Sequence, residues 1–138
     1  MITQIINNIF ISDIHESHIN DIYNKYNINI VINCTENSKF INLDTIKKVR
    51  IPLSFDMDQN DISLLNNNLE NILDYLKKNI LDNVILICCY DGIRISPLIV
   101  ALFLVKYAKI TNKKQINDIF KSKNDKIYID YDLDCFNI

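Results

Sequence analysis

Apolar residues along the chain are spaced in a way that predicts strands alternating with helices. Short β-branched runs bounded by polar residues predict strands at 5–11 and 28–33, and a third run, at 46–53, ends near Pro52. The continuous apolar run at 84–88 is typical of a strand buried on both faces of a mainly parallel sheet. We expect this run to be the central strand.

Helical spacing of apolar residues fills the segments between and after these strands. It is found in three segments, at 14–26, 62–80 and 113–121. Ser63 or Asp61 is placed to cap the second of these helices. Pro97 opens a strongly apolar segment, PLIVALFLVKYA, that is long enough for a further, buried helix.

Alternation of strands with helices predicts an α/β fold with a central, mostly parallel sheet flanked by helices. The 138 residues, of which 49% are hydrophobic, suffice for one core, so we expect one domain spanning residues 1–138. Ligands of such sheets bind at the carboxyl ends of the strands. A site is therefore expected in the segment CYDGIRIS, which follows the central strand.

Charge and cysteine content narrow the possible partners. The net charge is -2 and basic residues form no block, so nucleic acid is not expected as a partner. The chain has no signal-like N-terminus and no apolar run of roughly 20 residues, the length that spans a bilayer, which predicts a cytoplasmic protein without a membrane partner. The four cysteines form no C-x-x-C pair, so we expect reduced thiols and neither a metal nor a cofactor.

The segment after the central strand has the chemistry of an anion-binding site. Backbone N–H groups of a tight loop and of a helix N-terminus converge there, which favours an anion and stabilises the thiolate of a cysteine at the start of the loop. Gly92, the only glycine in the chain, permits a turn that other residues would strain. Ser96 and Pro97 are typical of an N-cap and a first helical residue.

The segment ILICCYDGIRISPLIVALFLVKY resembles the signature of cysteine-dependent protein phosphatases, H-C-x-x-G-x-x-R-S followed by proline and an apolar helix. The resemblance covers nearly the whole chain. IFISDIHES resembles the opening strand and turn of the dual-specificity phosphatases, INIVINCT their second strand, and IPLSFDMDQNDIS their general-acid loop. This resemblance implies a dual-specificity-phosphatase-like fold.

The resemblance also implies roles for individual residues. It places the nucleophile at Cys89, the general acid at Asp56, six residues before Ile62, and a further catalytic residue at Ser96. The implied phosphate-binding loop consists of Cys89, Tyr90, Asp91, Gly92, Ile93, Arg94 and Ile95.

The signature is altered in two places. Cys88 occupies the position of the family's histidine, and Ile95 that of its arginine, while the arginine is displaced by one residue to Arg94. Counting from Cys88 instead gives C-x5-R ending at Arg94, but Gly92 and Ser96 then fall one place late. Three landmarks, Gly92, Ser96 and Pro97, favour Cys89 as the nucleophile position. One, the spacing to Arg94, favours Cys88.

The displaced arginine predicts impaired catalysis. Phosphoryl transfer needs charge stabilisation on the equatorial oxygens, and a planar guanidinium provides it with two parallel hydrogen bonds. By analogy with an arginine finger, losing this contact costs on the order of 10³ to 10⁵ in rate. We therefore predict a pseudophosphatase, which keeps the anion-binding loop and whose partners are phosphoproteins or proteins of a phosphorylation pathway.

Two other functions fit the same residues. The first is a working dual-specificity phosphatase, with Cys89 or Cys88 as nucleophile, Asp56 as acid, and Arg94 reaching the phosphate through a remodelled loop. The second is a sulfurtransferase, because Cys89-x-x-Gly92-x-Arg94 also resembles the shorter active loop of rhodaneses, in which a cysteine carries a persulfide. The remaining cysteines, Cys34 and Cys135, are expected to be packing residues.

Overall fold

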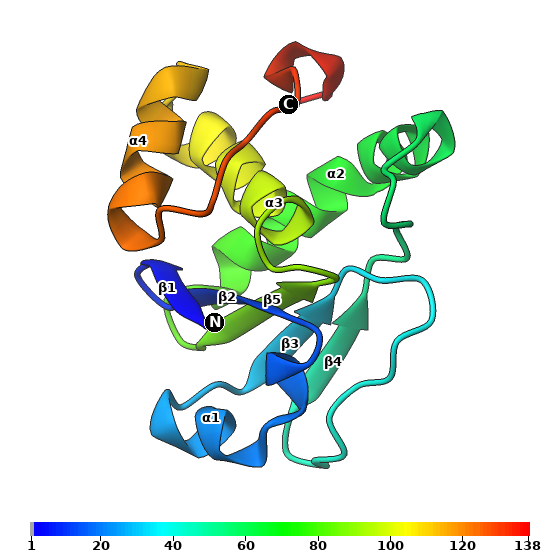
Figure 1. The fold of residues 1–138 in the computed structure, drawn as a ribbon, viewed down its shortest axis with the longest axis vertical. Helices are drawn as coiled ribbons and strands as arrows, with labels where there is room; N and C mark the ends of the chain where they lie inside the picture. Colours follow the sequence, from blue (N-terminus) through cyan, green and yellow to red (C-terminus); the bar gives the residue numbers. More distant parts are fainter. Residues whose placement is uncertain (1) are drawn as a thin grey trace.

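The computed structural model describes residues 2–138, which form a five-stranded sheet with helices on both faces (Figure 1). The strands are β1 (Thr3–Ile6), β2 (Ile9–Asp13), β3 (Ile30–Asn33), β4 (Lys47–Arg50) and β5 (Ile85–Cys89). They lie in the order β1-β2-β5-β3-β4, and all neighbouring pairs are parallel except β1 and β2. The predicted α/β class and the central position of the 84–88 run are confirmed.

The first predicted strand is in fact a hairpin. Residues 5–11 do not form one strand, because the chain turns at Asn7 and Asn8 and divides the segment between β1 and β2. Asn8 has a φ of 64°, in the left-handed region that asparagine tolerates better than most residues. The hairpin adds an antiparallel edge strand to an otherwise parallel sheet.

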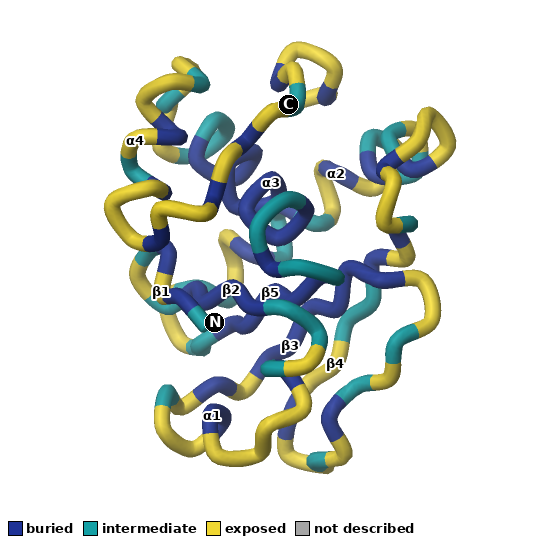
Figure 2. Tube along the Cα trace, viewed as in Figure 1, coloured by how far each residue is buried: buried dark blue, intermediate teal, exposed yellow. Residues whose placement is uncertain are grey.

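Helices cover the two faces of the sheet unequally (Figures 1 and 2). The larger apolar cluster lies between the sheet and the helices α2 (Gln59–Asn79), α3 (Ile95–Phe103) and α4 (Lys113–Lys123). The smaller cluster lies on the opposite face, against the short helix α1 (Asn20–Lys25). All five residues of β5 are buried, as expected for a strand covered on both faces.

Two predicted helices differ in extent from the structure. The segment 14–26 contains a 3₁₀ turn (Glu16–His18) and only six residues of α1, because Ile19 between them is extended, with φ -85° and ψ 110°. The apolar segment from Pro97 is helical from Ile95 onward, and its last turn, Leu104–Ala108, is π-helical. It ends at Lys109, which adopts the left-handed conformation (φ 58°).

A pair of aspartates begins α2 and fixes the loop before it. Asp58, and neither Ser63 nor Asp61, is the N-cap: its carboxylate accepts the Asp61 N–H at 3.0 Å. The Asp61 carboxylate accepts in return from the N–H of Asp58 at 3.0 Å, and also from the N–H and hydroxyl of Ser54. This capping box holds residues 54–58 against the helix start.

The C-terminal segment lies across the helical layer. Figure 1 shows it rising from the end of α4, between α4 and α3, to the C-terminus above α3. Asn117 of α4 exchanges two hydrogen bonds with the backbone of Ile129, and Asn66 of α2 exchanges two with the backbone of Cys135 and Asn137. The segment ends with the 3₁₀ helix Leu133–Cys135. Sequence patterning did not predict this ordered segment, because it lacks a helical or strand period.

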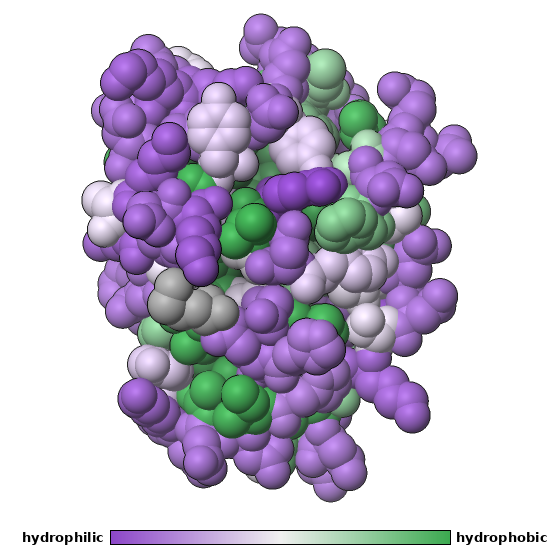
Figure 3. Space-filling view, in the orientation of Figure 1, coloured by the Kyte–Doolittle hydropathy of each residue, from purple (hydrophilic) through white to green (hydrophobic). Residues whose placement is uncertain are grey.

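The face of the molecule drawn in Figure 3 is mostly polar, with groups of apolar side chains between hydrophilic ones. Among residues 2–138, no helix is long and apolar enough to cross a membrane.

The Asp61 carboxylate makes the free energy of unfolding depend on pH in the acidic range. Burial raises its pKa, but the hydrogen bonds from Ser54 and Asp58 outweigh burial and hold the pKa below its usual value. A depressed carboxyl pKa stabilises the fold above the unfolded-state value, and this contribution is lost as the pH falls through the folded-state value. We predict that Asp61→Asn lowers the free energy of unfolding near pH 7 by about 1 kcal/mol.

The same substitution should flatten the acid limb of the stability curve below about pH 4. Urea unfolding at a series of pH values measures both effects. An Asp61→Asn protein that loses stability on acidification as steeply as the native chain would contradict this role.

Candidate functional site

The loop between β5 and α3 is pressed against the end of β2. Gly92 has a φ of +73°, and a Cβ atom placed on it would lie 2.7 Å from the Asp13 nitrogen and 2.8 Å from the Ser12 carbonyl carbon. Both contacts are with backbone atoms, which cannot rotate away. Glycine is therefore required here for its conformation and for its lack of a side chain.

The sulfur of Cys89 lies inside this loop. It accepts the backbone N–H groups of Gly92 at 3.2 Å and of Ser96 at 3.3 Å. Cys89 also packs in the larger apolar cluster and is fully buried. Two backbone donors of the loop thus point at the thiol.

Cys88 faces the other side of the sheet. It packs in the smaller cluster near α1, because successive strand residues alternate between faces. Burial is the main cause that raises the pKa of its thiol to about 12. The structure thus brings Cys89, and not Cys88, to the loop.

Asp91 accepts two further backbone donors of the loop. Its Oδ1 accepts the N–H groups of Ile93 at 3.0 Å and of Arg94 at 3.3 Å, and also the thiol of Cys89, whose sulfur lies 3.7 Å away. We call the N–H groups of Gly92, Ile93, Arg94 and Ser96 the cradle. Two of them point at the thiol and two at the carboxylate of Asp91.

Ser96 is not the N-cap that its position before Pro97 predicts. Helix α3 already begins at Ile95, and no side chain caps it in the usual way. Asp91 accepts the N–H groups of Ile93 and Arg94, which precede the helix, and the Cys89 sulfur accepts the N–H of Ser96. Among the residues that the structure describes, none pairs with the buried hydroxyl of Ser96.

Arg94 points out of the loop. Its Nη2 donates to the carbonyl of Phe55 at 2.8 Å and to the hydroxyl of Tyr131 at 3.4 Å, and its guanidinium stacks 4.8 Å from the Phe55 ring centre. Arg94 therefore joins the loop to the 54–58 segment and to the C-terminal segment. Its neighbour Ile95 is only 2% exposed and packs in the larger apolar cluster.

The other arginine of the chain also holds backbone. Arg50 donates to the carbonyls of Thr35 at 2.9 Å and of Ser38 at 2.7 Å, and its guanidinium lies over the ring of Phe40. Both guanidinium groups are thus committed to carbonyl oxygens outside the cradle.

Asp56 is an exposed residue of the 54–58 segment and lies beside Arg94. Together with Arg94, Tyr128, Asp130 and Tyr131 it lines a pocket of about 270 Å³. The three residues from the C-terminal segment were not predicted, because no local pattern places that segment beside the loop. Asp56, the predicted acid position, and the displaced Arg94 therefore share one pocket.

Tyr90 connects the loop to its surroundings. Its hydroxyl donates to the Leu53 carbonyl at 2.8 Å and accepts the Glu36 N–H at 3.1 Å. Its ring packs edge-on against Phe55. The loop, the 54–58 segment and the connection after β3 are consequently held in one arrangement.

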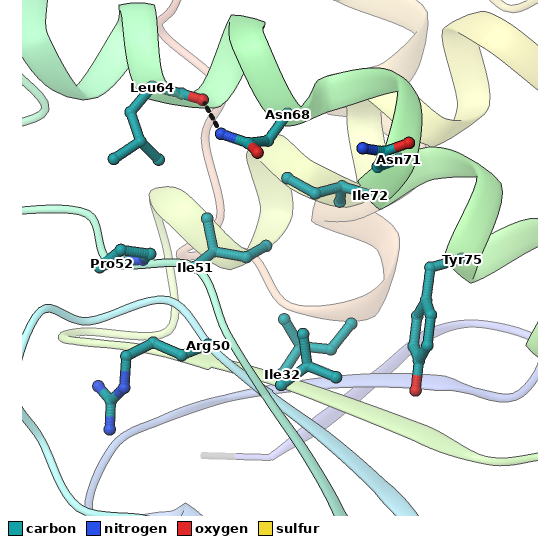
Figure 4. Close-up of a pocket in the computed structure, with 10 residues that line it drawn as sticks. Ile32, Arg50, Ile51, Pro52, Leu64, Asn68, Asn71, Ile72 and Tyr75 are labelled. Atoms are coloured by element: carbon teal, nitrogen blue, oxygen red, sulfur yellow. Dashed lines mark hydrogen bonds between the residues drawn. The ribbon is translucent and has the colours of Figure 1, made fainter.

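A larger pocket, of about 440 Å³, lies away from the loop, between α2 and the β4 edge of the sheet (Figure 4). Ile51, Leu64 and Ile72 make it mainly apolar, with Asn68, Asn71 and Arg50 at its margins. Figure 4 shows side chains of α2 facing those of the strand end across it. None of the sequence-predicted site residues lines this pocket.

The remaining thiols and acids form no further site. Among residues 2–138, no group of three His, Cys, Asp or Glu side chains is placed to hold a metal ion. Cys34 is buried, which raises the pKa of its thiol. The expectation that Cys135 packs in the core is wrong, because this residue is exposed on the C-terminal segment.

Comparison with known proteins gives a clear result for the fold. No family model and no curated protein matches the sequence. Solved structures match over 94% of this chain: human DUSP28 (TM-score 0.78, 11% identity, 84% of that chain) and a leucine-rich-repeat and phosphatase-domain protein from Entamoeba histolytica (0.72, 19%, 82%). The human tyrosine phosphatase-like serine/threonine/tyrosine-interacting protein matches with a TM-score of 0.74 at 11% identity, over 87% of its chain.

The fold is dual-specificity-phosphatase-like. The segment that the sequence resemblance identifies as the phosphate-binding loop connects β5 to α3 in the five-stranded sheet. At these identities the comparison establishes architecture alone.

Gly92 offers a test of the loop geometry. We predict that Gly92→Ala lowers the free energy of unfolding by about 1 to 3 kcal/mol, because the new Cβ would collide with the backbone of β2 at a positive φ. Urea denaturation measures the change. The exposed substitution Gln115→Ala is the control and should stay within about 0.5 kcal/mol of the native chain. Equal stabilities of the two variants would contradict the close approach of loop and strand.

Proposed function

We propose that this protein is a pseudophosphatase, a dual-specificity-phosphatase-like domain that hydrolyses phosphoesters poorly or not at all. Its partners would be phosphoproteins or proteins of a phosphorylation pathway. The observation that carries the proposal is the position of Arg94, whose guanidinium binds the Phe55 carbonyl and the Tyr131 hydroxyl outside the cradle.

Transfer of a phosphoryl group to Cys89 needs positive charge beside that phosphoryl group in the transition state. The transition state spreads negative charge over three equatorial oxygens, and backbone N–H groups alone offset only part of it. Ile95, at the position implied for the arginine, is apolar and buried. Turning Arg94 inward would break its two hydrogen bonds and its stacking on Phe55.

One comparison structure is compatible with a role of this kind. It is described as a tyrosine phosphatase-like interacting protein, a phosphatase-like architecture named for what it contacts. We infer a corresponding role here, in which the folded surface around the loop contacts another protein.

A working dual-specificity phosphatase is the second candidate. The observation that favours it is the sulfur of Cys89, which keeps two backbone N–H donors. In this alternative Cys89 attacks phosphorus, Asp56 protonates the leaving oxygen, and Arg94 swings into the cradle. The rhodanese alternative is set aside, because it relied on the loop alone and the dual-specificity-phosphatase-like fold extends over 94% of the chain.

Cysteine-dependent hydrolysis separates the two candidates. We predict that the native chain hydrolyses an aryl phosphate such as p-nitrophenyl phosphate at a rate indistinguishable from that of Cys89→Ser. The expected deficit relative to a site with a guanidinium on the phosphate is about 10³-fold or more. A rate that Cys89→Ser abolishes would refute the pseudophosphatase proposal.

Arg94→Lys serves as a second variant for the same assay. If Arg94 reaches the phosphate during turnover, lysine should lower any measured rate, since a point charge cannot replace the bidentate contact. If Arg94 only joins the loop to Phe55 and Tyr131, the substitution should leave the background rate unchanged and lower only the thermal stability.

A further inference from the structure

Asp91 supplies an anion to the cradle from within the loop. Its carboxylate accepts the N–H groups of Ile93 and Arg94, at 3.0 and 3.3 Å, and lies 3.7 Å from the sulfur of Cys89. A phosphoryl group placed over that sulfur would need the same donors. We propose that Asp91 is the resident ligand of the loop and that its carboxylate excludes oxyanions from the cradle.

Competition for donors and charge repulsion both support this exclusion. Each backbone N–H has one proton, so a carboxylate that accepts the two N–H groups leaves them unavailable to a second anion. Hydrogen bonds from N–H groups to an ionised carboxylate are also stronger than those to a neutral acceptor. Because Asp91 belongs to the loop, its carboxylate is always present at high effective concentration.

No guanidinium offsets the resulting repulsion. An incoming phosphate would meet the negative charge of Asp91 beside the thiol, while Arg94 is turned toward Phe55 and Tyr131. Two anions that share one pair of donors in a partly buried loop disfavour each other strongly. The loop therefore keeps the shape of an anion site but holds its own occupant.

This inference rests on the proposed function and refines its partner class. If the Asp91 carboxylate excludes oxyanions from the cradle, the domain does not bind a phosphoryl group there. A partner protein is then recognised by contacts outside the cradle. The partner is then a protein of a phosphorylation pathway bound by the surface around the loop, in preference to a phosphoprotein held by its phosphate.

Tungstate binding tests the inference directly, because tungstate is an oxyanion of phosphate-like shape. Isothermal titration of the full chain should show at least about tenfold tighter tungstate binding for Asp91→Ala than for the native chain, since the N–H groups of Ile93 and Arg94 are then free of the carboxylate. Asp91→Asn, which keeps the shape and one acceptor oxygen but loses the charge, should fall between them. Asp118→Ala, on the exposed face of α4, changes the net charge equally and should bind like the native chain.

One outcome would overturn the inference. It is a folded Asp91→Ala, or a folded Asp91→Asn if the alanine variant does not fold, that binds tungstate no better than the native chain. That result would mean that Asp91 only shapes the turn.

Failure of the proposed function gives a different result. The pseudophosphatase proposal fails if native protein hydrolyses an aryl phosphate through Cys89, whatever the tungstate affinities are. The inference about Asp91 fails on tungstate affinity alone. Asp91→Ala that binds tungstate but stays inactive would support both, because vacating the cradle supplies no guanidinium.

Discussion

The site depends on where the backbone N–H groups of one short loop find acceptors. Gly92, at positive φ against the end of β2, turns the chain so that the four cradle donors face inward. In this protein the acceptors are the sulfur of Cys89 and the carboxylate of Asp91, both from the loop itself. The loop can therefore be rigid and complete without an external anion.

The position of the arginine follows from the same local geometry. A one-residue displacement in a tight loop changes the direction of a side chain, and Arg94 accordingly leaves the loop toward Phe55 and Tyr131. Ile95 turns into the apolar cluster, where it strengthens the packing of α3. Together with the capping box of Asp58 and Asp61, the outward arginine holds the 54–58 segment in place.

The sequence predicted much of the fold, because the spacing of apolar residues changes clearly between the strands and the helices. The buried run of β5, the helix α2 and the position of the loop followed from apolar spacing and from single residues such as Gly92. The hairpin of β1 and β2 was missed although Asn7 and Asn8 signal a turn, since the strands on either side are both β-branched. The α3 cap was assigned to Ser96 because the rule for Ser-Pro is local, whereas the helix starts one residue earlier and has no side-chain cap.

The pattern of the sequence could not predict which residues of the C-terminal segment join the site, or the direction of the Arg94 side chain. Tyr128 and Tyr131 join the pocket of Asp56 and Arg94 only through long-range packing of the C-terminal segment on α4 and α2. The direction of a loop side chain, which decides whether Arg94 meets phosphate or a carbonyl, likewise depends on neighbours distant in sequence.

A crystal structure of the native protein soaked in tungstate would test the central claim most directly. The account predicts that no tungstate lies over Cys89, that the Asp91 carboxylate remains on the N–H groups of Ile93 and Arg94, and that the Arg94 guanidinium remains on the Phe55 carbonyl. Tungstate bound over the Cys89 sulfur, with the Arg94 guanidinium turned inward onto its oxygens, would contradict the claim.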